Sequence, residues 1–335
     1  MMGHEFDYRS RGELKIWFIA CCIGGAALTL QQAESAAQSY PQRPLRFVVP
    51  FPPGGGADNL ARIVGQPAGE RLGQQIVIDN RTGAGGNISA EVVAKAAPDG
   101  YTLLQGNLAH AISQSLQRRP GYDIANDFTA VTLLASIPFL LVANPSVNAG
   151  SVKELIALAK ARPGQLNYAS SGYGGPSHMA MELFRTLTGA DLKHVPYKGA
   201  GPASVDLIAG QVHVMFPTIS AALPHVRSAR LKGLALTSAR RSPLAPEIAT
   251  VGESVPGYEA TTWFGVMVPK GTPAGIVNKL HAVFTGVLQA PDVRERLTNQ
   301  GFDVVGNSPT EFARFIRGEI PKWAKVARAS GTLLD

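Results

Sequence analysis

Glycine-rich loops that lead directly into helices are the feature of this sequence best suited to bind an anion. The first lies in residues 47–64, FVVPFPPGGGADNLARIV, where an apolar strand passes through Gly54–Gly56 into an amphipathic helix. Glycine lets a ligand approach the backbone closely and adopts φ values that other residues avoid. The N–H groups and positive dipole end of a helix attract carboxylate or phosphate. We expect Asp58 or Asn59 to be the N-cap of this helix.

A second unit of the same kind lies in residues 167–184, NYASSGYGGPSHMAMELF, with a helix expected to start near Ser177. Two anion-ready helix starts more than 100 residues apart indicate a cleft between two lobes. Each loop alone is equally consistent with a tight strand-to-helix turn, which any α/β protein needs.

The N-terminal segment has the pattern of a secretory signal peptide. Basic residues precede an apolar run, residues 16–30, and small residues follow it up to a predicted cleavage site after Ala37. The run is too short for a comfortable membrane span. We therefore expect an exported mature protein that starts near residue 38. Both cysteines, Cys21 and Cys22, lie in this segment, so the mature chain has no thiolate for catalysis, disulfides or metal binding.

The net charge of +7 can be interpreted in two ways. The positive charge either attracts acidic small molecules or only keeps the surface solvated. Lysines and arginines are scattered, and an exported protein has little access to nucleic acid, so we expect no nucleic-acid partner. An exported hydrolase is a weaker alternative, because Ser170 and Ser171 lack the preceding glycine of a nucleophile elbow. No HExxH motif is present and the histidines show no metal-ligand spacing, so we expect no catalytic residues, metal or cofactor.

Strands and helices alternate along the chain, which indicates an α/β fold. An apolar strand over residues 133–143 is expected to cross between the lobes, and a strand over 263–268 to return. Lobe 1 is then 38–143 plus 263–335, and lobe 2 is 144–262. The glycine-rich loops follow the carboxyl ends of strands, where ligands bind in such folds.

Seven motifs occur in order along the mature chain: PFPPGGGAD (50–58), NRTGAGGN (80–87), APDGYTLL (97–104), SGYGGPSH (171–178), VPYKG (195–199), DLIAG (206–210) and WFG (263–265). With these motifs the chain resembles the periplasmic Bug receptors of the tripartite tricarboxylate transporter group, from Tyr40 to Leu334. The resemblance implies a two-lobed periplasmic binding protein (Venus flytrap), each lobe a mixed, mostly parallel sheet flanked by helices. It implies a monomer, not an enzyme, that captures a small organic acid and delivers it to a transporter of one large and one small membrane subunit. A binding protein that feeds a signalling receptor is the alternative.

The resemblance also implies that backbone N–H groups of the two facing loops and bridging waters hold the carboxylate. We add polar or aromatic residues near these loops and at other strand ends. The candidate ligand-binding residues are Phe51, Pro53, Gly54, Gly55, Gly56, Asp58, Asn107, Ser171, Gly172, Tyr173, Gly174, Ser177, His178, Lys198 and Thr218. For Asp58 the alternative is a helix cap, for His178 a packing role, and for Lys198 a solvated surface position.

Overall fold

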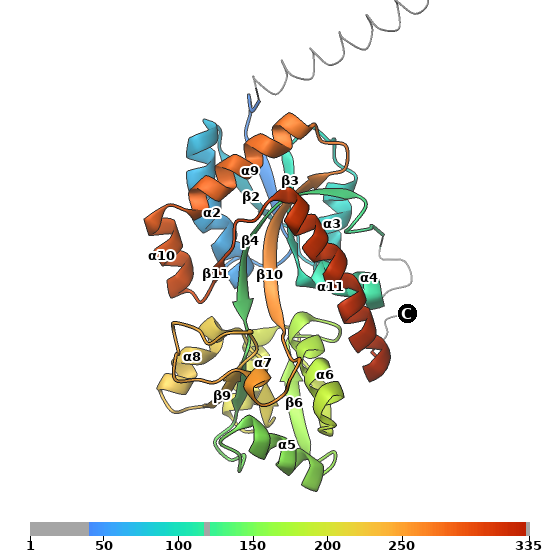
Figure 1. The fold of residues 1–335 in the computed structure, drawn as a ribbon, viewed down its shortest axis with the longest axis vertical. Coiled ribbons are helices and arrows are strands. Elements are labelled where there is room, and N and C mark those ends of the chain that lie inside the picture. The colour runs from blue at the N-terminus through green and yellow to red at the C-terminus, as the bar shows by residue number, and fades with distance from the viewer. Residues whose placement is uncertain (1–39, 117–120, 333–335) are drawn as a thin grey trace, which may run out of the picture.

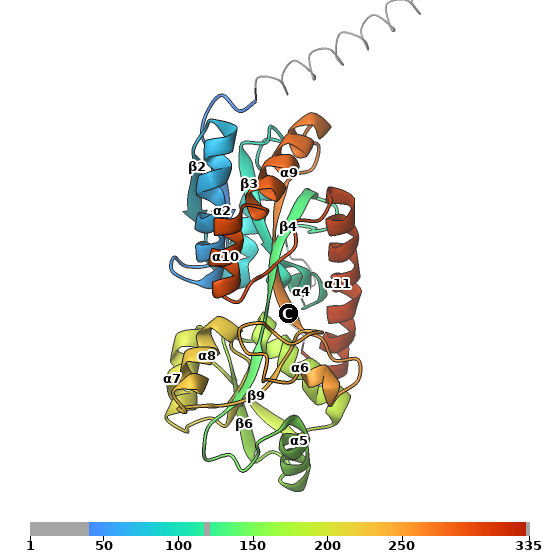
Figure 2. The ribbon, with the colours of Figure 1, turned by 60° about the vertical axis from the view of Figure 1, so that its left-hand side comes forward.

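The computed structural model describes residues 40–116 and 121–332. The predicted signal peptide, residues 1–37, lies outside the described residues. The described chain forms two lobes, each built on its own sheet and arranged along the long axis of the molecule (Figure 1, Figure 2). Within the described ranges no helix combines the length and the hydrophobicity needed to cross a membrane.

Lobe 1 contains a six-stranded sheet in the order β11-β4-β10-β3-β1-β2. Its strands are β1 (Leu45–Val49), β2 (Ile76–Asn80), β3 (Thr102–Asn107), β4 (Phe128–Pro138), β10 (Thr261–Pro269) and β11 (Asp303–Val304). β1 pairs in parallel with β2 and β3, whereas β10 pairs antiparallel with β3 and β4. The helices of this lobe are α2 (Gly56–Leu72), η1 (Ala84–Gly86), α3 (Asn87–Ala94), α4 (Leu108–Leu116), α9 (Ala274–Leu288), α10 (Pro291–Asn299) and α11 (Pro309–Ser330).

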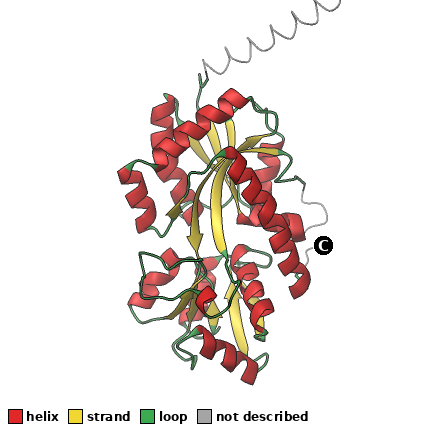
Figure 3. Cartoon of the chain, viewed as in Figure 1, coloured by secondary structure: helices red, strands yellow, loops and turns green. Residues whose placement is uncertain are grey.

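Lobe 2 contains a five-stranded sheet in the order β7-β6-β8-β5-β9. Its strands are β5 (Leu140–Ala143), β6 (Leu166–Ser170), β7 (Leu192–Pro196), β8 (Val214–Met215) and β9 (Lys232–Leu236). β6 pairs in parallel with β7 and β8, and β5 runs antiparallel to β8 and β9. Its helices are α5 (Val152–Ala161), α6 (Pro176–Thr188), α7 (Ala200–Ile208), α8 (Ile219–Arg227) and η2 (Val251–Glu253). Helices flank both sheets (Figure 3), and the predicted two-lobed α/β architecture with mixed sheets is confirmed. The expectation that the sheets are mostly parallel holds for strand direction but is wrong for the pairing, because β10 and β11 in lobe 1 and β5 in lobe 2 pair antiparallel with their neighbours.

Two stretches of chain connect the lobes. The strand predicted over residues 133–143 is divided in the structure, because β4 ends at Pro138 in one sheet and β5 begins at Leu140 in the other. Phe139 is the residue between the two strands. Its N–H donates to Thr237 Oγ1 at 2.7 Å, and its carbonyl accepts from the Thr237 N–H at 3.0 Å. Ala260, just before β10, donates to the Thr237 carbonyl at 3.0 Å. Thr237 therefore links the outgoing and returning connections.

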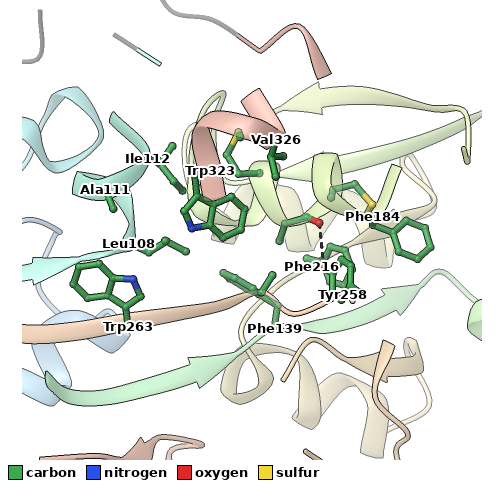
Figure 4. Close-up of a cluster of buried hydrophobic side chains, with 14 of the residues drawn as sticks. Leu108, Ala111, Ile112, Phe139, Phe184, Phe216, Tyr258, Trp263, Trp323 and Val326 are labelled. Atoms are coloured by element: carbon green, nitrogen blue, oxygen red, sulfur yellow. Dashed lines mark hydrogen bonds between the residues drawn. The ribbon is translucent and has the colours of Figure 1, made fainter. Parts of the chain in front are cut away.

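A hydrophobic cluster continues from lobe 1 into lobe 2 behind these connections. Figure 4 shows Phe139 in this cluster together with Trp263, Trp323, Phe216 and Tyr258. Trp323 belongs to α11, which packs against α4 of lobe 1 and α6 of lobe 2. The crossing region is thus a packed joint between two separate sheets.

Candidate functional site

Four helices begin between the lobes. α2 follows β1 of lobe 1, and α6, α7 and α8 follow β6, β7 and β8 of lobe 2. Their N-caps are Gly55, Gly175, Gly199 and Thr218, and no side chain of the described residues caps any of the four. By contrast, the Ser308 hydroxyl caps α11. The first N–H groups of a helix have no partner within it, so these four starts offer donors to a ligand.

The four helix starts line one cleft of about 470 Å³. The lining residues at the helix starts are Gly55, Gly56, Ala57, Pro176, Ser177, Gly199, Ala200, Thr218 and Ser220. The preceding loops add Phe51, Pro52, Pro53 and Ser171. A second hollow of about 580 Å³ beside α2 and β2 is lined by residues of lobe 1 alone, between Arg62 and Ile78. The smaller cleft is the better candidate site, because both lobes contribute to it.

The rest of the cleft wall is mostly apolar. It consists of residues at the lobe connections and strand ends: Ile137, Phe139, Met215, Phe216, Pro217, Thr262 and Phe264. None of the described residues that line the cleft has an ionisable side chain. An anion in this cleft is therefore attracted by backbone N–H groups and helix dipoles rather than by a lysine or arginine.

Asp58 supports the first glycine-rich loop from behind. The N-cap prediction for Asp58 and its neighbour is wrong, because α2 begins at Gly56 and Asp58 lies in its first turn, 2 % exposed. Its carboxylate accepts hydrogen bonds from Gly54 N (3.0 Å), Arg62 Nε (2.9 Å) and Asn80 Nδ2 (3.1 Å). Burial raises the pKa of Asp58, but these hydrogen bonds and the charge of Arg62 outweigh burial and hold the pKa below its ordinary value. Asp58 is therefore ionised, and its carboxylate holds the loop in place through the hydrogen bond from Gly54.

His178 supports the second glycine-rich loop in a similar way. Its Nδ1 accepts a hydrogen bond from the Gly174 N–H at 3.0 Å, where Gly174 has a φ of +71°. The ring is 2 % exposed, stacks on His194 at 3.9 Å between centroids, and lies 4.9 Å from the Tyr173 ring. Burial first, and then the positive charge of Arg185, lowers the pKa of His178 to about 4. The ring is therefore neutral at neutral pH, which leaves Nδ1 able to accept this bond.

The structure brings seven of the sequence-predicted site residues into the cleft wall: Phe51, Pro53, Gly55, Gly56, Ser171, Ser177 and Thr218. Eight others do not line it: Gly54, Asp58, Asn107, Gly172, Tyr173, Gly174, His178 and Lys198. Gly54, Gly172 and Gly174 shape the two loops through positive φ angles. Lining a cleft is not the same as contacting a ligand, so ligand contact stays a prediction for all of them.

Asn107 and Lys198 occupy opposite environments. Asn107 ends β3 and is 1 % exposed, and its Oδ1 accepts from the Ala109 N–H at 2.7 Å. Its Nδ2 is buried without a hydrogen-bond partner in the described part of the chain. Lys198 is exposed in the loop before α7. The neighbouring Gly199, rather than the lysine, reaches the cleft.

Sequence reasoning placed Lys198 and Thr218 near the ligand site but did not identify the starts of α7 and α8 as two further helix N-termini that supply backbone donors there. Each follows a strand, but its loop contains one glycine or none, and so lacks the Gly-rich signal of the first two. It also missed most of the apolar wall. In the sequence, Phe139, Phe216 and Phe264 cannot be distinguished from ordinary core residues. Phe139 and Phe216 do belong to the buried cluster, and they line the cleft as well.

Comparison with known proteins gives consistent matches over nearly the whole described chain. Residues 60–332 match the family model of the tripartite tricarboxylate transporter family receptor. Protein BugT of Bordetella pertussis is 39 % identical over 305 residues, which cover 90 % of this chain and 94 % of BugT. An R. palustris protein solved with adipate is 40 % identical, with a TM-score of 0.80, over 88 % of this chain and 99 % of that one. MatC from Rhodopseudomonas palustris with bound malate is 36 % identical, with a TM-score of 0.77, over 86 % and 99 %.

Proposed function

Because this chain belongs to the tripartite tricarboxylate transporter family of receptors, we propose that its interlobe cleft captures a small organic acid by the carboxylate group. The protein is a periplasmic carboxylate-binding receptor of a solute-binding family rather than a member of an enzyme family. Two of its structural relatives were solved with adipate and malate, both of them carboxylates.

The convergence of four uncapped helix starts on one cleft is the observation that carries this proposal. Each helix N-terminus carries roughly half a positive charge and stabilises an adjacent anion by about 0.3–1 kcal/mol, or more when partly buried. A carboxylate also accepts hydrogen bonds from several N–H groups at once, and such charge-assisted bonds are stronger than neutral ones. The glycines Gly55, Gly56 and Gly199 leave these groups unobstructed by side chains.

We infer that binding draws the lobes together. The ligand bridges the start of α2 in lobe 1 and the starts of α6, α7 and α8 in lobe 2. The lobes then rotate about Phe139 and the chain near Ala260, close to the boundaries at 143/144 and 262/263 expected from the sequence. Closure is favoured only by the extra affinity of the closed form for the ligand.

In this proposal the closed receptor, a monomer exported with its signal cleaved near Ala37, docks on a transporter with one large and one small membrane subunit. Of the site residues, Gly55, Gly56, Ser177 and Thr218 face the carboxylate. Gly54, Asp58, Gly172, Gly174 and His178 position the loops, and Phe51, Pro53, Ser171 and Tyr173 shape the walls and rim. Lys198 acts from the exposed loop before α7, and Asn107 acts from the buried end of β3.

Thermal unfolding with and without small carboxylates tests the proposal. The protein is first unfolded, dialysed and refolded, because a receptor can retain its ligand through purification. A ligand that binds only the folded state raises Tm in a concentration-dependent way. We expect one class of acids to do so and matched uncharged amides not to. A folded, ligand-free protein whose Tm responds to no acid would overturn the proposal.

A further inference from the structure

We propose that the cleft selects carboxylic acids that carry no ammonium group, and that it rejects amino acids with the same carbon skeleton. The inference rests on the proposed function and names the substrate class for that same site. The preferred ligand has one or more carboxylates on a largely apolar body. The argument comes from three properties of the cleft: its dipoles, its acceptors and its wall.

The dipoles at the cleft all have the same sign. The starts of α2, α6, α7 and α8 point positive ends at the ligand, and no carboxylate is among the described lining residues. The buried carboxylates on two of these helices are already engaged. Asp58 of α2 accepts from Gly54, Arg62 and Asn80. Glu182 of α6 accepts from Tyr168 Oη and from Arg185 Nη1. An ammonium group in the cleft therefore meets positive potential without a counter-charge.

Three backbone carbonyls of residues in the cleft wall already accept hydrogen bonds. The Phe51 carbonyl accepts from Asn80 Nδ2 at 2.9 Å, and the Pro217 carbonyl accepts from the Leu140 N–H at 2.9 Å. The Phe139 carbonyl accepts from both the N–H and the hydroxyl of Thr237, at 3.0 and 3.1 Å. An ammonium group has three donors and no acceptor, so burial there leaves donors unpaired.

Side-chain hydroxyls at the helix starts are paired with each other. Ser171 Oγ lies 3.1 Å from Ser177 Oγ, and Thr218 Oγ1 lies 3.3 Å from Ser220 Oγ. The same cleft is also lined by Ile137, Met215, Phe216 and Phe264, which favour an apolar ligand body. Thr262 adds one hydroxyl to this wall, so the selection that we infer acts against ammonium rather than against a ligand hydroxyl.

Isothermal titration of the refolded, ligand-free protein with matched acid pairs tests the inference. The pairs are glutarate and glutamate, adipate and 2-aminoadipate, and 3-phenylpropanoate and phenylalanine, each differing by one ammonium group. We expect at least one acid to bind, and its amino counterpart to bind about 30-fold more weakly or not at all. The ratio should persist from pH 6.5 to pH 8, where the α-ammonium stays charged.

The outcomes separate the inference from the function that it rests on. An amino acid that binds as tightly as its amine-free partner would overturn the selectivity and leave carboxylate capture intact. If no acid of any pair binds to the folded protein, the inference is wrong, and the proposed function is wrong as well if no other small carboxylate raises its Tm.

Discussion

Replacing Ser220 by aspartate should move stability and affinity in opposite directions. Ser220 is exposed, lies at the second position of α8 and lines the cleft. A carboxylate in the first turn of a helix stabilises the fold by about 0.3–1 kcal/mol. The same charge repels a ligand carboxylate. The cube root of the cleft volume of about 470 Å³ is about 8 Å, which we take as an upper limit on the separation of the two charges, so that the repulsion calculated from it is a minimum.

At about 8 Å and an effective dielectric constant of about 20, the repulsion is about 2 kcal/mol. This corresponds to about 30-fold weaker binding. Denaturant unfolding measures the first effect and isothermal titration the second, and Ser220→Asn is the matched neutral control. If Ser220→Asp and Ser220→Asn bind the acid equally, the carboxylate does not lie at these helix starts and the electrostatic account is wrong.

The other predictions concern glycine conformation, pH and surface charge. Gly54 has a φ of +82°, which strains any residue with a Cβ, whereas Gly55 has an ordinary φ of −81°. Gly54→Ala should therefore lower the free energy of unfolding by about 1–2 kcal/mol, and Gly55→Ala by clearly less. Equal losses for the two variants in urea unfolding would refute this. Burial lowers the pKa of His110 from 6.5 to about 4, although its bond to the Gly86 carbonyl opposes this. The unfolded chain thus binds a proton that the folded chain does not between pH 6.5 and 4, and the free energy of unfolding should fall by up to about 3 kcal/mol as pH drops through that window. His178 and His194, whose pKa values burial also lowers to about 4, contribute to the loss of stability in the same window, so His110→Gln should remove only about a third of the slope, and an unchanged slope would contradict the assignment. Lys198→Ala should change the affinity for the acid less than about 3-fold, because Lys198 is exposed and lies outside the cleft wall. A larger loss of affinity in titration calorimetry would show that the lysine binds the acid directly.

The parts of the site with strong local signals were predictable from sequence. The loops at 50–56 and 171–175 are recognisable in the sequence because each has consecutive glycines between a strand and a helix. Both loops lie at the cleft. The alternation of strands and helices, with the family resemblance, gave the two-lobed architecture. Loop glycines with positive φ, such as Gly54 and Gly174, have a local cause that is visible in the sequence.

The parts that depend on tertiary geometry were not predictable. Aspartate is a residue type that often caps helices, which is why Asp58 was expected to be the N-cap. In the structure Gly55 is the N-cap and α2 starts at Gly56, so the Asp58 carboxylate accepts hydrogen bonds from Arg62 and Asn80 instead. Thr218 was expected at the site because it follows a strand end, but the convergence of the starts of α6, α7 and α8 depends on β7 and β8 lying on either side of β6, which no single loop reveals. The break of the predicted strand at Phe139 likewise depends on Thr237, about 100 residues away in the chain.

Backbone amide NMR is the most direct test of capture by helix starts. The ¹⁵N-labelled, refolded protein is titrated with whichever acid of the matched pairs binds most tightly. The account predicts large, saturable downfield shifts of amide protons from both lobes within the set Gly56, Ala57, Ser177, Ala200 and Ser220, because the carboxylate oxygens of the ligand accept hydrogen bonds from up to four of them. Saturable shifts confined to other regions, with these five amides unchanged, would contradict it.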